Sequence, residues 1–269
     1  MGLSQPSVSR IISALEQEIG AALLTRTTRA VMLTEVGADY LARIEPILAA
    51  LEEADHVARG TGELRGILRI GVTTCFAVRD VIPRLPAFME QHPALRIEFL
   101  MGDQLQDLVT EGVDVALRFG ALADSAATAK KIGLSSRLLA ASPEYLKRMG
   151  TPKIPADLAA HSLIVGPAGA SSAGWSFLRD NTTTSIHVEG RLIFNVNEAA
   201  TAAAVAGLGI VSTGTWGCRP ELESGALVQI LTEWTMYPVE VNAVFAAGCA
   251  AKPSARAFTE FLATSLRGA

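Results

Sequence analysis

Short hydrogen-bonding side chains and a single cation occupy one side of the first predicted helix, over residues 4–19. The candidate contact residues of this segment are Ser4, Gln5, Pro6, Ser7, Ser9 and Arg10. Gln and Arg near a helix N-terminus can read base edges in the DNA major groove, while Ser hydroxyls and backbone N–H groups bind phosphates. A solvated helix surface is also polar, although it more often carries Lys and Glu four residues apart. The pattern alone allows both interpretations.

Two further cations follow this helix. The segment LLTRTTRAVMLTEVG (residues 23–37) has two short β-favouring runs on either side of a turn, which predicts a small hairpin that carries Arg26 and Arg29. Beside a helix in the major groove, such a wing would place both guanidinium groups against the phosphate backbone. We therefore add these two arginines to the candidate DNA contacts.

A second group of candidate residues follows the predicted strands of the remaining chain. In open α/β sheets, ligands bind beyond the carboxyl ends of the strands, near helix N-termini. This rule selects Thr73, Thr74, Cys75, Gly102, Asp103, Arg118, Phe119, Gly166, Asn195 and Asn197. Hydroxyls and free N–H groups suit an anion such as a carboxylate, and Arg118 would add a charge-assisted hydrogen bond. Asp103 would repel an anion, so the alternatives of a neutral ligand, a zwitterionic ligand or no ligand remain.

Each of these positions also fits an ordinary structural role. The threonines are capping residues in any arrangement, and Arg118 could instead pair with a surface acid. Cys75 could be a redox sensor, but no group nearby in the sequence lowers the pKa of its thiol, so a small buried thiol is the preferred interpretation.

The sequence lacks the residue patterns of disulfide frameworks, zinc sites, serine hydrolases and nucleotide-binding loops. Cys75, Cys218 and Cys249 are far apart and odd in number, which argues against a disulfide framework and fits a reducing compartment. The four histidines are scattered and form no zinc signature. A G-x-S-x-G elbow and a phosphate-binding loop are missing, and G-L-G at 207–209 lacks the rest of a dinucleotide fingerprint. We expect neither an enzyme nor a metal or cofactor, but a small organic effector.

The first helix must position the polar groups. Ser4 is a good N-cap, Pro6 lies in the first turn, where its missing N–H costs nothing, and Gly20 predicts the end of the helix. The opposite side carries an apolar stripe at helical spacing, formed by Val8, Ile11, Ile12, Leu15 and Ile19.

A long helix is predicted from about residue 35 to residue 59, with Thr34 as its cap. Leu41, Ile44, Leu48 and Leu51 follow a heptad-like seam with acidic residues outside it. A narrow apolar seam on a long helix indicates pairing between two helices and so a dimer, although the seam could instead pack on its own domain.

The remaining residues alternate between strands and helices. Strands are predicted at 67–72, 95–101 and 114–119, with helices at about 78–91 and 104–111. A second unit contains the run 186–194, a helix from Asn197 to Ala206 and the strand 209–213; the strand 239–246 and a helix from about Pro253 to Leu266 close the chain. Such alternation argues for parallel sheets covered by helices, in two lobes like those of a periplasmic binding protein.

Composition supports an ordinary globular protein of 269 residues, with 49% hydrophobic and 19% charged residues. The net charge of −4 argues against a protein that is basic throughout, but not against a local basic patch. A signal peptide is not recognisable, and the run 199–211 is too short to span a bilayer. We expect a soluble, cytoplasmic protein without membrane contact.

The segment LSQPSVSRIISALEQEIGAALLTRTTRAVMLTEVG (residues 3–37) resembles the recognition helix and wing of the LysR-type transcriptional regulators. The S-Q-P-S-V-S-R start, the L-E-x-E-I-G exit, the R-T-T-R wing and the L-T-x-x-G start of the linker occur in the family's order, and the resemblance continues along the chain. Leu24 stands where the family usually has Phe. The resemblance implies a first helix before this block. We expect that helix to be missing here and part of the apolar stripe to be exposed or covered by another element.

The predicted fold is a partial winged helix-turn-helix and a long linker helix, followed by an α/β, periplasmic-binding-protein-like effector domain of two lobes. The expected boundaries are 1–34 for the DNA-binding part, 35–62 for the linker, and 63–269 for the effector domain, with one lobe at 63–141 and 238–269 and the other at 142–237. The resemblance implies double-stranded DNA and a small effector as partners, and a homodimer that assembles into a dimer of dimers. The alternative is a solute-binding or dominant-interfering protein that does not bind DNA productively.

Overall fold

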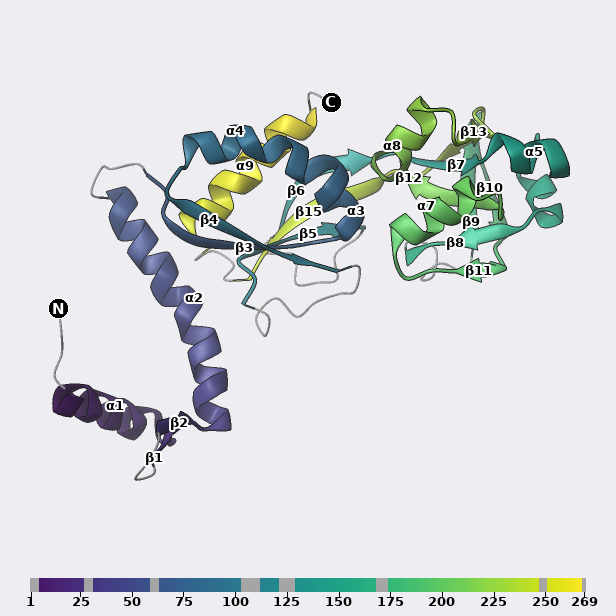
Figure 1. Cartoon of the computed structure of the whole chain (residues 1–269). Helices are drawn as coiled ribbons and strands as arrows, with labels where there is room; N and C mark the ends of the chain where they lie inside the picture. Colours follow the sequence, from purple (N-terminus) through teal and green to yellow (C-terminus); the bar gives the residue numbers. More distant parts are fainter. Residues whose placement is uncertain are drawn as a thin grey trace.

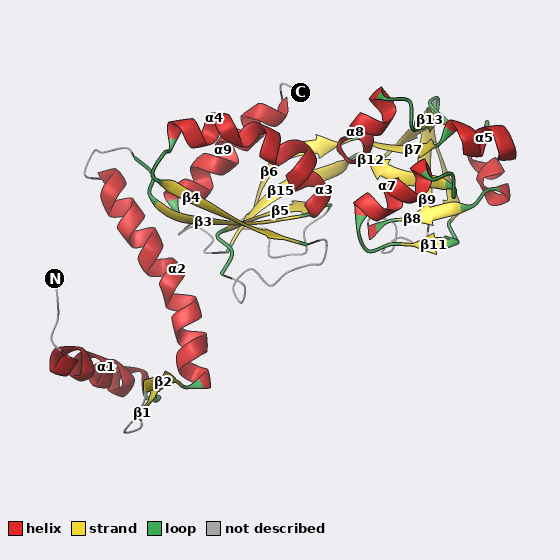
Figure 2. Cartoon of the chain, viewed as in Figure 1, coloured by secondary structure: helices red, strands yellow, loops and turns green. Residues whose placement is uncertain are grey.

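A computed structural model of the chain describes residues 5–26, 31–58, 63–102, 112–120, 129–167, 174–246 and 251–267. Figure 1 shows a helix-and-hairpin unit at one end, a long helix, and two α/β lobes side by side. Strands lie at the centre of each lobe and helices around them (Figure 2). Among the described residues, helices that are both long and apolar enough to cross a membrane do not occur.

The N-terminal unit consists of α1 (Gln5–Ile19) and an antiparallel hairpin of β1 (Leu24–Arg26) and β2 (Val31–Leu33). The helix ends where predicted because Gly20 adopts a φ of 76°, which side chains with a Cβ rarely tolerate. The backbone N–H groups of Gly20 and Ala21 both donate to the Glu16 carbonyl, at 2.9 and 3.2 Å. The predicted helix and hairpin are confirmed.

The long helix α2 (Glu35–Ala58) begins directly after the hairpin. The Thr34 hydroxyl accepts a hydrogen bond from the Gly37 N–H at 2.9 Å and donates to the Ala22 carbonyl at 2.7 Å, which confirms Thr34 as the cap. A Cβ on Gly37 would lie 2.0 Å from the Leu23 carbonyl oxygen, so only glycine allows α2 to approach the hairpin this closely.

The first lobe is built on a five-stranded sheet in the order β4-β3-β5-β15-β6. Its strands are β3 (Gly66–Val72), β4 (Leu95–Met101), β5 (Val115–Phe119), β6 (Ala129–Ser135) and β15 (Val239–Phe245). β3 is parallel to β4 and β5, but β15 is antiparallel to β5 and β6. The three predicted strands are confirmed, whereas the sheet is mixed because the chain returns from the second lobe through β15.

Helical turns from Thr74 to Gln91 follow β3. They comprise α3 (Thr74–Phe76), the wide turn η1 (Ala77–Val81), the tight turn η2 (Ile82–Arg84) and α4 (Leu85–Gln91). The helix starts earlier than the predicted residue 78, since Thr73 is the last extended residue and the helical turns begin at Thr74. Pro83 and Pro86 fall at the starts of η2 and α4, where a missing N–H is tolerated. α4 and α9 (Pro253–Arg267) cover one face of the sheet (Figure 1).

The second lobe contains a five-stranded sheet in the order β11-β8-β12-β7-β13. Its strands are β7 (Arg137–Ala141), β8 (Leu163–Val165), β11 (Leu192–Ile193), β12 (Ile210–Gly214) and β13 (Val228–Ile230). A smaller sheet combines β9 (Gly174–Arg179), β10 (Thr182–His187) and β14 (Thr235–Met236). The helices are α5 (Pro143–Met149), η4 (Pro155–Ala160), α7 (Asn197–Val205) and α8 (Thr215–Glu223).

One predicted boundary is wrong, and one predicted run divides between two sheets. The run 186–194 is not one strand, since its start pairs with β9 and its end with β8, and Gly190 passes so close to β8 that a Cβ would lie 2.5 Å from Val165 Cγ2. The predicted first lobe includes residues 137–141, but β7 pairs with β12 and β13 of the second lobe. The chain therefore crosses between the lobes at Ser136, between β6 and β7.

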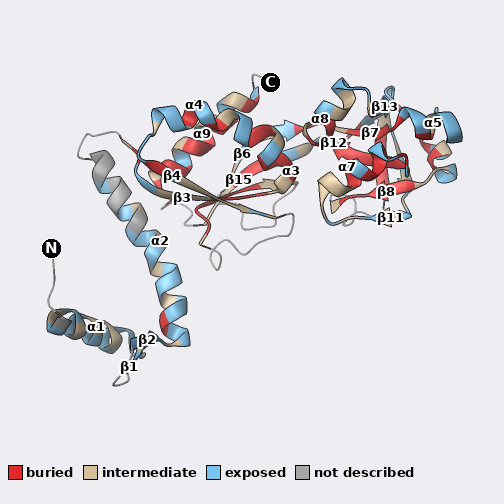
Figure 3. Ribbon diagram, in the orientation of Figure 1, coloured by how far each residue is buried: buried red, intermediate tan, exposed pale blue. Residues whose placement is uncertain are grey.

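Buried side chains concentrate at the two sheets, whereas α1, β2 and α2 are mostly exposed or half-buried (Figure 3). The first core packs residues such as Leu68, Ile70, Phe88 and Phe258 between the sheet and its helices. The second lobe has one core around Tyr145, Trp175 and Phe177 and another around α7. Tertiary packing thus holds the lobes firmly and leaves the N-terminal helices as open surfaces.

Candidate functional site

The polar side of α1 is the candidate nucleic-acid surface. Arg10 and Pro6 are exposed, and Ser7 and Ser9 are half-buried. The backbone of Gln5 begins α1 and that of Arg26 ends β1. Ser4, Arg29 and the tip of the hairpin lie outside the described residues. The helix and the hairpin therefore adjoin as predicted, with the Arg10 guanidinium accessible.

The apolar side of α1 is exposed in this chain. Val8 and Ile11 keep 43% and 54% of their surface accessible, and Ile19 is also exposed. This confirms the expectation that part of the stripe is uncovered. Isolated apolar side chains are common on surfaces, but a contiguous helical stripe marks a contact surface.

Glu16 fixes the hairpin against α1, which the sequence pattern did not reveal. Its Oε1 atom accepts hydrogen bonds from the backbone N–H groups of Leu23 and Leu24, at 2.8 and 3.0 Å. The two donors precede and begin β1, so one carboxylate sets the angle at which the wing leaves the helix. The L-E-x-E-I-G motif contains this residue, but only the folded turn shows which of its two glutamates is used.

The seam of α2 is open on the single chain. Leu41, Leu48 and Leu51 are exposed, the last two by 54% and 59%, and Ile44 is half-buried. α2 touches β2 at its start and α9 of the first lobe. Most of the seam is therefore available to a second helix.

The predicted ligand residues of the first lobe gather at one end of its parallel strands. Thr73, Thr74 and Cys75 follow β3, and the Gly102 N–H after β4 donates to the Val72 carbonyl at 3.1 Å. Arg118 and Phe119 end β5, the neighbour of β3 on its other side. Cys75 is buried, as predicted, and Asp103 lies outside the described residues.

The predicted residues of the second lobe meet at the start of α7. Gly166 follows β8, and a Cβ there would lie 3.3 Å from Asn197 Oδ1, so the glycine permits close approach to the helix. The Phe194 N–H donates to the Val165 carbonyl at 2.8 Å, which places Asn195 beside the same strand end. α3 contacts α7, so the two predicted groups face each other across the lobes.

Aromatic rings and a thiol also join the two lobes. The Trp216 ring of α8 stacks on Phe76, with centroids 5.1 Å apart, and meets Phe119 edge-on at 6.4 Å. Cys75 Sγ lies 4.0 Å from the Gly217 carbonyl oxygen. Gly217 also has no room for a Cβ, which would lie 2.7 Å from Thr213 Oγ1. The sequence patterns did not single out Trp216, although it lies three residues after the predicted strand 209–213.

A bidentate ion pair also crosses the lobes. Arg79 Nη1 and Nη2 lie 2.6 and 2.7 Å from the two carboxylate oxygens of Glu221, and both side chains are about four-fifths buried. Hydrogen bonding to Glu221 raises the pKa of Arg79, and the same bonds lower the pKa of Glu221. Glu198, in the first turn of α7, also favours the charged Arg79, although both of its carboxylate oxygens are buried without a hydrogen-bond partner.

The described residues contain no group of three His, Cys, Asp or Glu side chains that could hold a metal ion. Burial raises the pKa of the Cys218 thiol to about 12, so this cysteine is a neutral thiol near neutral pH. The site is thus made of hydroxyls, amides, guanidinium groups and aromatic rings.

Comparison with known protein families assigns both parts of the chain. Residues 61–267 match the LysR substrate binding domain, and residues 1–38 match the bacterial regulatory helix-turn-helix protein family of lysR type. The chain belongs to the LysR family of transcriptional regulators. The N-terminal match ends within the first turn of α2.

Curated relatives of this LysR-family chain are transcriptional regulators. It is 36% identical over 244 residues to an HTH-type transcriptional regulator of Haemophilus influenzae, which covers 90% of this chain and 85% of the relative. It is 33% identical to the HTH-type transcriptional regulator DmlR of Escherichia coli, over 97% of this chain and 86% of DmlR.

Solved structures show the same architecture. CrgA of Neisseria meningitidis superimposes with a TM-score of 0.67 at 29% identity, covering 98% of this chain and 90% of CrgA. AphB of Vibrio cholerae gives a TM-score of 0.64 at 29% identity, covering 97% of this chain and 89% of AphB. The LysR-type fold of helix-turn-helix part, helical linker and two-lobed regulatory domain is therefore confirmed.

Proposed function

We propose that this chain is a DNA-binding transcriptional regulator whose DNA contacts are controlled by a small organic effector held between its two lobes. The observation that carries the proposal is the exposed polar side of α1, with Arg10 accessible beside a hairpin that Glu16 fixes in place. A helix N-terminus with a basic wing beside it can contact bases and phosphates together.

The effector would bind among the strand ends of the first lobe and the start of α7. Thr73, Thr74 and Gly102 would supply hydroxyl and N–H donors from one lobe, and Asn195 and Asn197 amide groups from the other. A ligand that contacts both lobes binds one lobe arrangement better than another, and only this difference in affinity can shift the protein between states. Cofactors have no role in this scheme.

Two copies would pair through the seam of α2. Leu41, Leu48 and Leu51 are exposed on one chain, and a second α2 would bury them. α2 contacts α9 directly, so the helix that carries this seam is connected to the first lobe. A change in the arrangement of the lobes can therefore change the distance between the α1 helices of two paired chains. Such a regulator would act in the cytoplasm, because the chromosome that it binds is there. It would act as a dimer or as a dimer of dimers.

A gel-shift titration with the intergenic DNA upstream of the gene tests the proposal. Selective binding that weakens with salt is expected, because phosphate contacts release counterions. A scrambled duplex of equal length is the control. Equal affinity for both duplexes, or the absence of binding at low salt, would contradict the proposed function.

A further inference from the structure

A cavity lies between the lobes, and none of the predicted effector residues lines it. Its volume is about 450 Å³, within the range of small-molecule sites. Residues 78–80 of η1 form its wall on the first lobe, and Trp216 with residues 219–221 of α8 form the wall on the second. The ion-paired side chains of Arg79 and Glu221 also line it. A molecule in this cavity would touch both lobes.

Arg219 gives the second-lobe wall an available cation. Within the described part of the chain, its guanidinium group makes neither a hydrogen bond nor an ion pair, whereas the guanidinium of Arg79 is fully engaged by Glu221. A half-buried guanidinium with free N–H groups is suited to bind a carboxylate in a bidentate manner.

Asp80 gives the first-lobe wall an unused acceptor. The residue is 2% exposed, its Oδ1 atom has only a long contact of 3.4 Å with Arg84 Nη1, and Oδ2 lacks a hydrogen-bond partner. Burial raises the pKa of Asp80, which shows how poorly its charge is solvated, although Arg84 and Arg219 counteract this. A buried acceptor without a donor is costly, and a ligand donor would relieve the cost.

The remaining walls are apolar. Val78, Pro220 and Trp216 line the cavity together with the charged groups. Asp80 and Arg219 line the cavity from opposite lobes and form no ion pair with each other, so a ligand with opposite groups at its ends could engage both.

We propose that this cavity is a second ligand site, which binds a small carboxylate that also carries an ammonium or hydroxyl donor on an apolar body. The carboxylate binds Arg219 of the second lobe, and the donor binds Asp80 of the first lobe. The ligand therefore reinforces the lobe contact that Arg79 and Glu221 already make, independently of any molecule at the α7 end of the cleft.

Calorimetric titration of the full chain with four probes that share a phenyl body tests this site. L-phenylalanine and L-phenyllactate carry both groups, 3-phenylpropionate carries only the carboxylate, and phenethylamine carries only the ammonium. At least one of the first two is expected to bind with a Kd below about 1 mM. Each single-group probe should bind at least about tenfold more weakly, because it loses a charge-assisted hydrogen bond. Tighter binding of phenylalanine than of phenyllactate would show that the site requires an ammonium donor. Equal affinities for the two would show that a hydroxyl donor serves as well as an ammonium.

Three variants locate the bound probe. Arg219→Gln should weaken the tighter probe at least about tenfold, and Asp80→Asn should weaken phenylalanine more than phenyllactate, because it removes the charge but keeps an acceptor. Arg96→Gln is the matched control, since Arg96 is exposed on β4 and pairs only with Glu98 among the described residues. Circular dichroism checks that each variant is folded.

Other outcomes would overturn the second site. These are failure of all four probes to bind, equal binding of all four, or binding that Thr74→Val weakens and Arg219→Gln does not. The last result would place the ligand at the predicted effector residues instead. None of these measurements involves DNA, so they decide the second site separately from the proposed function.

Discussion

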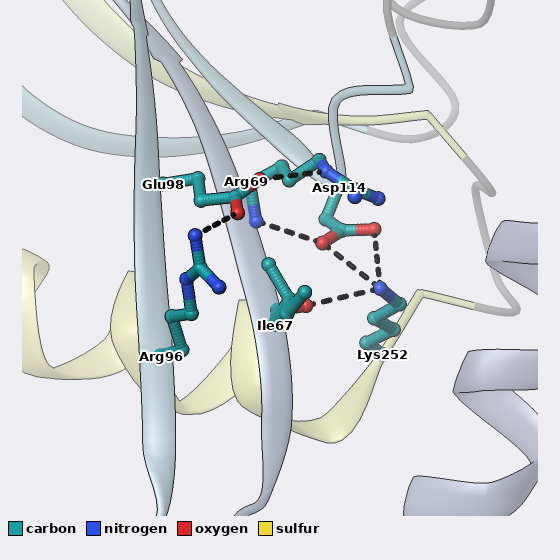
Figure 4. A network of polar contacts seen from close by, with 6 residues as sticks. All are labelled: Ile67, Arg69, Arg96, Glu98, Asp114 and Lys252. Carbon is teal, nitrogen blue, oxygen red and sulfur yellow. Dashed lines mark hydrogen bonds and ion pairs between the residues drawn. The ribbon is translucent and has the colours of Figure 1, made fainter.

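Lys252 and Asp114 form a buried ion pair at the base of the first lobe. Lys252 Nζ lies 2.9 and 3.0 Å from the two carboxylate oxygens of Asp114, and both residues are less than a tenth exposed. Figure 4 shows that Lys252 also reaches the Ile67 carbonyl, at 3.2 Å, while Asp114 accepts the Arg69 N–H at 2.9 Å. The pair thus ties the residue before α9 to β3 and to the entry of β5.

Lys252→Met is expected to destabilise the protein by about 3 to 5 kcal/mol, because it leaves the Asp114 carboxylate buried without its cation. Urea unfolding followed by circular dichroism measures the change. Lys131→Met is the control: Lys131 pairs with Glu240 at 2.7 Å on the surface, and its loss should cost less than about 1 kcal/mol. Equal losses of unfolding free energy in the two variants would show that the buried ion pair stabilises the protein no more than the surface pair does.

Glu221→Gln is expected to make stability less dependent on acid pH. The pKa of Glu221 is below its usual 4.5 in the folded chain, so its contribution is complete above that pH and is lost as the pH falls through the lowered value. The free energy of unfolding of the wild type should exceed that of the variant by about 1 to 3 kcal/mol at neutral pH. This difference should vanish in acid. Urea unfolding at a series of pH values measures it.

Glu223→Gln, on the exposed side of the same helix α8, is the control for this pH dependence and should change stability little at any pH. A difference between wild type and Glu221→Gln that persists unchanged at low pH would argue against the ionised pair as its cause.

Glu16→Ala is expected to weaken binding to operator and to scrambled DNA alike. The variant removes the acceptor of the Leu23 and Leu24 N–H groups, at a cost of about 1 to 3 kcal/mol, and so loosens the wing without touching a base-reading side chain. Fluorescence anisotropy with labelled duplexes measures both affinities. Glu18→Ala, at an exposed position of α1, should leave them unchanged, and so similar effects of the two variants would speak against the assigned role of Glu16.

Arg10→Ala and Arg29→Ala are expected to act differently on DNA. Arg10→Ala should lower the preference for the operator about tenfold or more, because Arg10 is assigned to base edges. Arg29→Ala should weaken all duplexes about equally and reduce the slope of affinity against salt, because Arg29 is assigned to phosphate. Competition gel shifts at several salt concentrations separate the two. Unchanged operator affinity in both variants would refute the assignment of this surface.

Leu48→Asp is expected to dissociate the paired chains, because it places a charge in the apolar seam of α2. Light scattering after size-exclusion chromatography gives the mass of the particle. Ala42→Asp, exposed on the same helix but outside the seam, is the control and should keep the wild-type mass. A wild-type mass for Leu48→Asp would mean that the seam does not pair two subunits.

The local elements and the family could be predicted from the amino-acid sequence. Gly20 ends α1, Thr34 caps α2, and the strand predicted at 95–101 is β4 (Leu95–Met101) in the structure. These features depend on residues near one another in the chain, through backbone conformation, capping and side-chain periodicity, so a sequence pattern contains them. The apolar stripe and the seam were predictable for the same reason.

Contacts between residues distant in the chain could not be predicted from the amino-acid sequence. Arg79 and Glu221 come from different lobes, and neither has a neighbour in sequence that marks it as half of a pair. The split of 186–194 between two sheets and the crossing at Ser136 also depend on which strand edge is available after folding. Ion pairs and strand pairings across the fold are chosen by the packing of whole elements, and a linear pattern does not contain that information.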